Sequence, residues 1–269
     1  MSDTSISNKD AARANAIPGR LKSVVISPRL TISYAGLSSQ ANDAIRRVAR
    51  RPSASVDESI SELLESSVRH TPELDFILCS HETNGSSRLV RISDGQVQEG
   101  ADFYWIGSAE SASSLSKIAL PANVKSDLPN HVSVKEQTLV HQFMSHVSSG
   151  SDPLVGGAVV NCLCSEYGHC YQNHASAEAW DVVLRFPSLL EDEQKLLRNR
   201  KAGLNHYVYN MCSPAERGIG VVGFYLEQPE VGWIHDPILR DDPIKVPAHS
   251  VPAFDEQLKC YVASRHLQQ

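Results

Sequence analysis

The sequence predicts a protein of the α+β class, in which antiparallel strands and helices are segregated along the chain. Short runs with alternating apolar residues occur in pairs joined by turn residues. Longer runs with helical periodicity also occur in pairs, so helices do not alternate regularly with strands. This order favours layered antiparallel sheets over a parallel βαβ arrangement. With 269 residues, the chain is long enough for one large domain with a substantial core.

The first predicted elements are two strands followed by two helices. Residues 21–26 have strand character, residues 30–34 have alternating apolar residues, and a Ser-Pro-Arg turn separates the two strands. Residues 41–51 form an amphipathic pattern that Pro52 ends. Ser55 and Glu58 then form an S-x-x-E capping box, which predicts the start of a second helix. The apolar positions of this helix are Val56, Ile60, Leu63, Leu64 and Val68.

Three strands and a helix are predicted next. Residues 74–79 and 89–92 have strand character, and the Asp-Gly pair at 94–95 is typical of a hairpin turn. Residues 103–106 form a short apolar strand pattern, and a helix of small residues is predicted over 109–120. The remaining predicted elements are a helix at 135–147, strands at 158–165 and 169–172, a helix at 189–200, and a hairpin of residues 218–226 and 231–235.

This organisation divides the chain into a polar N-terminal segment, a main domain and a C-terminal extension packed on the same domain. We place the boundaries at residues 1–20, 21–180 and 181–269, and the extension contains the helix and hairpin predicted last. The polar segment is rich in small residues and contains a Pro-Gly turn signal at residues 18–19.

Composition excludes several classes of function. A net charge of −6 argues against binding to nucleic acid or to an anionic membrane surface. We find no run of about 18 apolar residues and no apolar leader, so we expect a cytoplasmic protein without membrane spans. The nucleotide-binding Gly-rich motifs and the G-x-S-x-G nucleophile motif are also missing from the sequence.

One group of cysteines and histidines has to be weighed as a possible metal site. The group consists of Cys162, Cys164, His169, Cys170 and His174. The C-x-C spacing differs from the C-x2-C pairs of structural zinc sites. We therefore interpret these cysteines as buried, reduced strand thiols and predict neither a metal nor a cofactor.

Four segments, taken in order, resemble the β subunits of proteasomes and the related bacterial ring-protease subunit that works with an unfoldase. They are Leu21–Val24 with Ile32–Gly36 and the helix start Ala41–Ala44, then Ile106–Ser108, then Asp152–Gly157, and last the strand pair that follows. Ala109 stands where the family has a glycine, and Val155 stands where it has a serine. The resemblance covers roughly residues 1–180, and it implies that residues 1–20 are the remnant of the family's first hairpin and its loop.

These proteins are N-terminal-nucleophile (Ntn) hydrolases, and the resemblance implies a four-layer αββα sandwich of two antiparallel sheets. In the family, the nucleophile is the hydroxyl of the first residue, and its own α-amine acts as the general base. By resemblance, Lys22 is the buried lysine, Asp3 its partner, and Ser108 and Asp152 are the supporting hydroxyl and carboxylate.

The resemblance leaves the activity open, because the first strand and its leading nucleophile are not found ahead of Lys22. Three explanations compete: the chain starts inside a longer gene, it is a non-catalytic relative, or Ser2 is itself the nucleophile. The corresponding functions are peptide-bond hydrolysis or, alternatively, a structural or interaction subunit; a small-substrate amidase is a weaker alternative. The family further implies self-association into a ring or dimer and an unfoldase or another protein as a possible partner.

Overall fold

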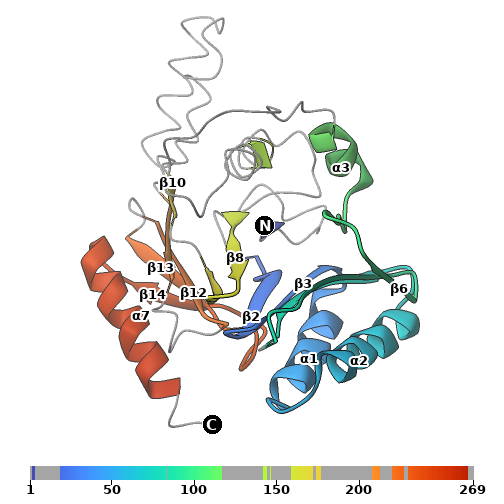
Figure 1. Cartoon of the computed structure of the whole chain (residues 1–269). Helices are drawn as coiled ribbons and strands as arrows, with labels where there is room; N and C mark the ends of the chain where they lie inside the picture. The colour runs from blue at the N-terminus through green and yellow to red at the C-terminus, as the bar shows by residue number, and fades with distance from the viewer. Residues whose placement is uncertain are drawn as a thin grey trace, which may run out of the picture.

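The computed structural model contains two five-stranded antiparallel sheets and two short strand pairs, with four helices in the part of the chain that it describes (Figure 1). The described residues are 2–3, 19–82, 84–116, 142–143, 146, 159–171, 174–176, 208–212, 220–226 and 230–265. The α+β class predicted from the sequence is confirmed. None of the helices in these ranges combines the length and apolar character that crossing a membrane requires.

The first sheet is an antiparallel meander with two helices inserted between its second and third strands. Its strands, in spatial order, are β2 (Ser23–Ser27), β3 (Leu30–Gly36), β4 (Leu74–His81), β5 (Ser87–Ser93) and β6 (Gln96–Glu99). The helices α1 (Ser38–Ala49) and α2 (Val56–Arg69) cover one face of this sheet (Figure 1).

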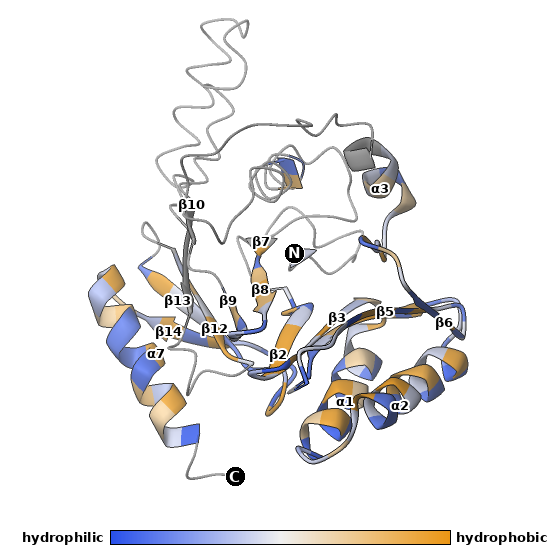
Figure 2. Cartoon of the chain, in the orientation of Figure 1, coloured by the Kyte–Doolittle hydropathy of each residue, from blue (hydrophilic) through white to orange (hydrophobic). Residues whose placement is uncertain are grey.

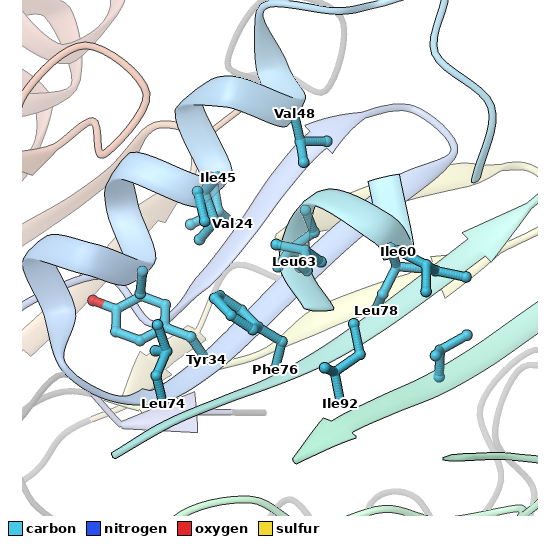
Figure 3. Packing of buried hydrophobic residues seen from close by; sticks show 14 residues of the cluster. Val24, Tyr34, Ile45, Val48, Ile60, Leu63, Leu74, Phe76, Leu78 and Ile92 are labelled. Atoms are coloured by element: carbon cyan, nitrogen blue, oxygen red, sulfur yellow. The ribbon is translucent and has the colours of Figure 1, made fainter. Parts of the chain in front are cut away.

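The helix-covered face of this sheet contains the largest apolar core of the protein. Alternate residues of β3 and β4 point toward the helices, among them Ile32, Phe76 and Leu78, and each is fully buried. Ile45 from α1 and Leu63 from α2 close the core from the other side (Figure 3). Both helices carry polar residues on their outer sides, as the alternating colours of Figure 2 show.

Helix α2 begins where the capping box predicts. The Ser55 hydroxyl accepts a hydrogen bond from the Glu58 backbone N–H at 3.2 Å, and the Glu58 carboxylate accepts one from the Ser55 N–H at 2.7 Å. The prediction that Val68 lies on the buried side is wrong. Val68 lies in the last turn of α2 and is 57% exposed.

The second sheet comes from the C-terminal part of the chain. Its strands, in order, are β10 (His174–Ser176), β11 (Val208–Cys212), β12 (Val222–Leu226), β13 (Val231–His235) and β14 (Ile244–Pro247). Helix α7 (Val251–Arg265) packs on this sheet through Phe254, Leu258 and Val262. A side chain at Gly232 would place its Cβ 1.9 Å from the Phe254 ring, so this contact requires glycine.

A third cluster of buried residues joins the two large sheets. Leu21 and Val25 contribute from the region of β2, and Val222, Phe224 and Val231 contribute from the second sheet. The strand pairs add Val160 from β7 (Val159–Val160), which pairs with β1 (Ser2–Asp3), and Cys162 and Tyr171 from the hairpin of β8 (Cys162–Ser165) and β9 (Gly168–Tyr171). The chain beyond residue 180 therefore shares a core with the main domain.

Several predicted elements differ from the structure. Residues 103–106 do not form a strand, and Phe103 is 62% exposed. The strand predicted over 158–165 is interrupted at Asn161. Helix α3 (Ala109–Ser116) begins where predicted, whereas the rest of that prediction, most of the helix at 135–147 and the helix at 189–200 lie outside the described residues. Strand β14 and helix α7 were not predicted.

Candidate thiol–imidazole site

The uncovered face of the first sheet carries a group of polar side chains at β3 and β4. Because strand residues alternate between faces, Cys79 and His81 point away from the helices that bury Leu78. Thr31 pairs with Cys79 across the two strands and shares this face. The antiparallel register thus gathers a hydroxyl, a thiol and an imidazole on one side of the sheet.

The β8–β9 hairpin covers this face and brings two more reactive groups. Cys164 and His169 pair directly across the hairpin, and β8 and β9 contact β4 and β2, respectively. The His169 backbone N–H donates to the Pro28 carbonyl at 2.8 Å. The Tyr171 hydroxyl accepts from the Val25 N–H at 3.0 Å and donates to the Ser23 carbonyl at 3.1 Å. These bonds fix the hairpin to β2 and to the β2–β3 turn.

Three potential ligand atoms meet beneath the hairpin. The Cys79 and Cys164 Sγ atoms and a ring nitrogen of His169 all lie within 4.8 Å of one another. His169 is 3% exposed, and both of its ring nitrogens have hydrogen-bond partners. Its Nδ1 lies 2.9 Å from Thr31 Oγ1, and its Nε2 lies 2.8 Å from His81 Nδ1.

The pKa values of the two thiols are shifted in opposite directions, because the thiols share a hydrogen bond. The hydrogen bond from the Cys79 thiol lowers the pKa of Cys164, and hydrogen bonds from His169 and Thr31 act in the same direction against the effect of burial. The same contact with Cys164 raises the pKa of Cys79, and burial adds to that rise. Cys164 is therefore the thiolate of the pair and Cys79 the proton donor.

Burial also affects the second histidine of the group. It lowers the pKa of His81, and the neighbouring His169 adds to the effect. At neutral pH, His81 is therefore a neutral imidazole, which can donate at one ring nitrogen and accept at the other. A thiolate, a thiol and two imidazoles in a semi-buried position can bind a soft or borderline metal ion, or undergo thiol chemistry.

The site residues predicted by resemblance lie on different elements of the structure, and their shared role stays a prediction. Lys22 immediately precedes β2, and its carbonyl accepts a hydrogen bond from the Tyr34 N–H at 2.9 Å, so strand pairing extends to it. Leu21 and Val25 lie in the cluster between the sheets, and the Ser23 hydroxyl lies 2.7 Å from that of Ser33. Alternation therefore directs Ser23 toward the inner side and Lys22 toward the opposite, helix-covered side.

The other predicted residues occupy separate positions. Ser2 and Asp3 form β1 and pair with Val160 and Val159 of β7. Ser108 precedes α3, and its hydroxyl accepts from the Ser111 N–H at 3.1 Å, as a helix N-cap does. Asp152 lies outside the described residues.

Only part of the thiol–imidazole site is signalled by the sequence. Cys164 and His169 were considered as ligands and interpreted as buried strand residues, without the partners on β4. The strands predicted at 158–165 and 169–172 leave a three-residue turn that would pair Cys164 with Cys170, whereas the structure has a two-residue turn at Glu166–Tyr167 and pairs Cys164 with His169. A further signal is the C-x-H spacing of Cys79 and His81, which places both side chains on one face of the strand predicted at 74–79 and continued to His81 in the structure.

Comparisons with known proteins identify no family for this chain. A scan against models of protein families found no match, and a search of curated proteins found no match either.

Proposed function

We propose that this chain has the four-layer αββα architecture of the Ntn hydrolases and acts as a non-catalytic structural or interaction subunit. The architecture is supported by the cluster of Leu21, Val25, Val222 and Phe224, to which both large sheets contribute. It is also supported by the helices, since α1 and α2 lie on one sheet and α7 on the other (Figure 1). In this proposal the two sheets are the inner layers and the helices the outer layers.

The non-catalytic role is supported mainly by the residue at the start of β2 whose side chain points to the layer between the two sheets. An Ntn site needs a cation there, so that the α-amine remains neutral and can accept a proton. Ser23 takes the inner position, is 1% exposed, and bonds to Ser33, whereas Lys22 is directed to the other side of the strand. A serine cannot supply the positive charge that the mechanism requires.

A role in protein contacts is supported by apolar residues that remain exposed at one edge of the first sheet. Val68 on α2 is 57% exposed, and Val97 on the edge strand β6 is 40% exposed. All four residues of β6 are exposed, and an edge strand of this kind can pair with a second chain. The proposed assembly is a ring or dimer of identical chains, which an unfoldase or another protein can join.

The proposal is tested by treating the purified chain with a peptide that carries a hydroxyl-reactive epoxyketone, followed by mass spectrometry. We expect no adduct at Ser2 and no peptide cleavage that depends on Lys22, and an oligomer in light scattering. Lys22→Ala and Ser23→Ala serve as a matched pair of adjacent residues on opposite sides of the strand. An adduct at Ser2, or cleavage that Lys22→Ala abolishes, would contradict the non-catalytic role; a monomer would contradict the assembly.

A second candidate function, amide hydrolysis with Ser2 as nucleophile, is favoured by one observation. The Ser2 Oγ is buried and has no hydrogen-bond partner among the residues that the structure describes. A buried hydroxyl without a partner is costly and is found at reactive positions. Under this alternative, Ser2→Ala removes both the epoxyketone adduct and the cleavage, and Ser23→Ala leaves both intact.

A further inference from the structure

The group of Cys79, Cys164 and His169 has the dimensions of a metal site. The three ligand atoms lie within 4.8 Å of one another, so the centre of their triangle is at most about 2.8 Å from each atom. Zn²⁺ binds thiolate sulfur at about 2.3 Å and imidazole nitrogen at about 2.0–2.1 Å. Side-chain shifts of about 0.5 Å for the sulfurs and about 0.8 Å for the nitrogen would therefore bring all three atoms to bonding distance.

The hydrogen bonds of His169 determine which of its nitrogens faces the thiols. Thr31 Oγ1 lies within hydrogen-bonding reach of both His169 Nδ1 and the Cys164 sulfur, so Nδ1 is on the thiol side. His169 Nε2 is on the other side, 2.8 Å from His81 Nδ1. Without a metal, His169 donates to the Cys164 thiolate; binding of an ion would displace this proton, so that Nδ1 carries the lone pair and Nε2–H donates to His81. Metal-binding histidines are commonly held in this way, with the non-ligating nitrogen donating to a fixed neighbour.

We propose that Cys79, Cys164 and His169 bind one Zn²⁺ ion, with His169 Nδ1 as the nitrogen ligand and His81 as the residue that orients it. Two sulfurs and one imidazole favour zinc over magnesium or calcium, which select oxygen ligands. The fourth position is left to an oxygen ligand on the side of the Thr31 hydroxyl. This proposal does not depend on the function proposed above.

The ion would act as a structural clip between the sheet and the hairpin. One thiol belongs to β4, while the other thiol and the imidazole belong to β8 and β9, so the metal bonds would cross the gap between the sheet and the hairpin. Metal bonds add to the hydrogen bonds that Pro28 and Tyr171 already provide. Removing the ion should therefore loosen the hairpin and leave the helix-covered face of the sheet intact.

The experiment is a titration of the reduced full-length chain with Co²⁺ and then Zn²⁺. We expect one Co²⁺ per chain, a thiolate-to-cobalt charge-transfer band in the near ultraviolet, and loss of that band as Zn²⁺ displaces cobalt. Cys79→Ser, Cys164→Ser and His169→Gln should each weaken zinc binding more than 100-fold. His81→Gln should weaken it about 10- to 100-fold, the range found for residues that orient a ligand.

Cys170→Ser is the matched control, because Cys170 is adjacent to His169 in β9 but lies on the alternate face of the hairpin. Its zinc affinity should equal that of the unchanged chain. If circular dichroism shows that a variant does not fold, the test is alkylation of the thiols in the unchanged chain. Zinc should protect Cys79 and Cys164 from alkylation and leave the exposed Cys260 reactive. The absence of a charge-transfer band, unprotected thiols, or a Cys79–Cys164 disulfide in place of metal binding would each overturn the proposal.

Discussion

The two faces of the first sheet differ although the same strands form both. On β4, Phe76 and Leu78 point toward α1 and α2 and are fully buried in an apolar core. Further along the same strand, Cys79 and His81 point to the other face, where the β8–β9 hairpin provides their partners. The helix-covered face is stabilised by burial of apolar side chains, which is non-directional. The hairpin-covered face is held by hydrogen bonds between specific polar side chains.

The difference indicates that one strand can contribute to folding stability through one face and to chemistry through the other. The helix-covered core depends on volume and packing, so its residues can be replaced only at a cost in folding free energy. The hairpin-covered face depends on the identity of a few atoms, so conservative changes there should affect binding more than folding. The predictions below test this separation, beginning with the largest expected effect.

The first prediction concerns Phe76, which is 0% exposed in the centre of the helix-covered core. Phe76→Ala should lower the free energy of unfolding by about 3–5 kcal/mol, because it removes a large apolar side chain and leaves a cavity. The measurement is urea-induced unfolding followed by far-ultraviolet circular dichroism. Zinc affinity, measured under conditions in which the variant is folded, should remain that of the unchanged chain.

Ile77→Ala is the matched control, because Ile77 is the next residue of β4 and lies on the partly exposed face. Ile77→Ala should lower the free energy of unfolding clearly less than Phe76→Ala does. Equal losses from the two substitutions, or a large loss of zinc affinity in Phe76→Ala, would break the separation between the faces.

The second prediction concerns His235, whose burial makes the free energy of unfolding depend on pH. Burial lowers the pKa of His235 to about 3, and the nearby positive charge of Arg20 acts in the same direction. Below pH 6.5, the unfolded chain gains a proton that folded His235 does not, so stability is lost as the pH falls toward 3. At pH 5 this loss amounts to about 2 kcal/mol relative to neutral pH.

His235→Gln should remove this part of the acid sensitivity, which is measured as the difference in unfolding free energy between pH 7 and pH 5. His249→Gln is the control, because His249 is exposed. The pH dependence of His249→Gln should match that of the unchanged chain. If His235→Gln retains the full acid sensitivity, the charge-sensitive group lies elsewhere in the protein.

The elements of the helix-covered face were largely predictable, because short-range rules fix them. The β2–β3 hairpin, the Ser55 capping box and the Asp94–Gly95 turn all follow from adjacent residues, and both turn residues have positive φ. Helix α7 was missed although Phe254, Leu258 and Val262 recur every four residues, a pattern typical of one helix face. Residues 103–106 were predicted as a strand from apolar character alone, and they lack a pairing partner in the described chain.

The candidate site was less predictable, because its members come from strands that are distant in the sequence. Thr31, Cys79 and His169 meet only when the hairpin packs on the sheet, and periodicity carries no information on that contact. The resemblance pointed to Lys22, but a displacement of one residue along a strand reverses the direction of a side chain. Ser23 therefore occupies the inner position, and the predicted role of Lys22 stays a prediction.

The smallest predicted effect lies at the edge of the helix-covered face, where α2 begins. Ser55 and Glu58 satisfy two backbone N–H groups that the helix itself leaves without partners. Ser55→Ala should lower the free energy of unfolding by about 1 kcal/mol, and hydrogen exchange should quicken in the first turn of α2. Ser53→Ala, at an exposed position in the preceding turn, should change neither quantity. Because α2 covers the face of the sheet opposite to Cys79 and His81, zinc affinity should be the same in both variants. A weaker affinity in Ser55→Ala alone would mean that the two faces of the sheet are coupled through the strand itself.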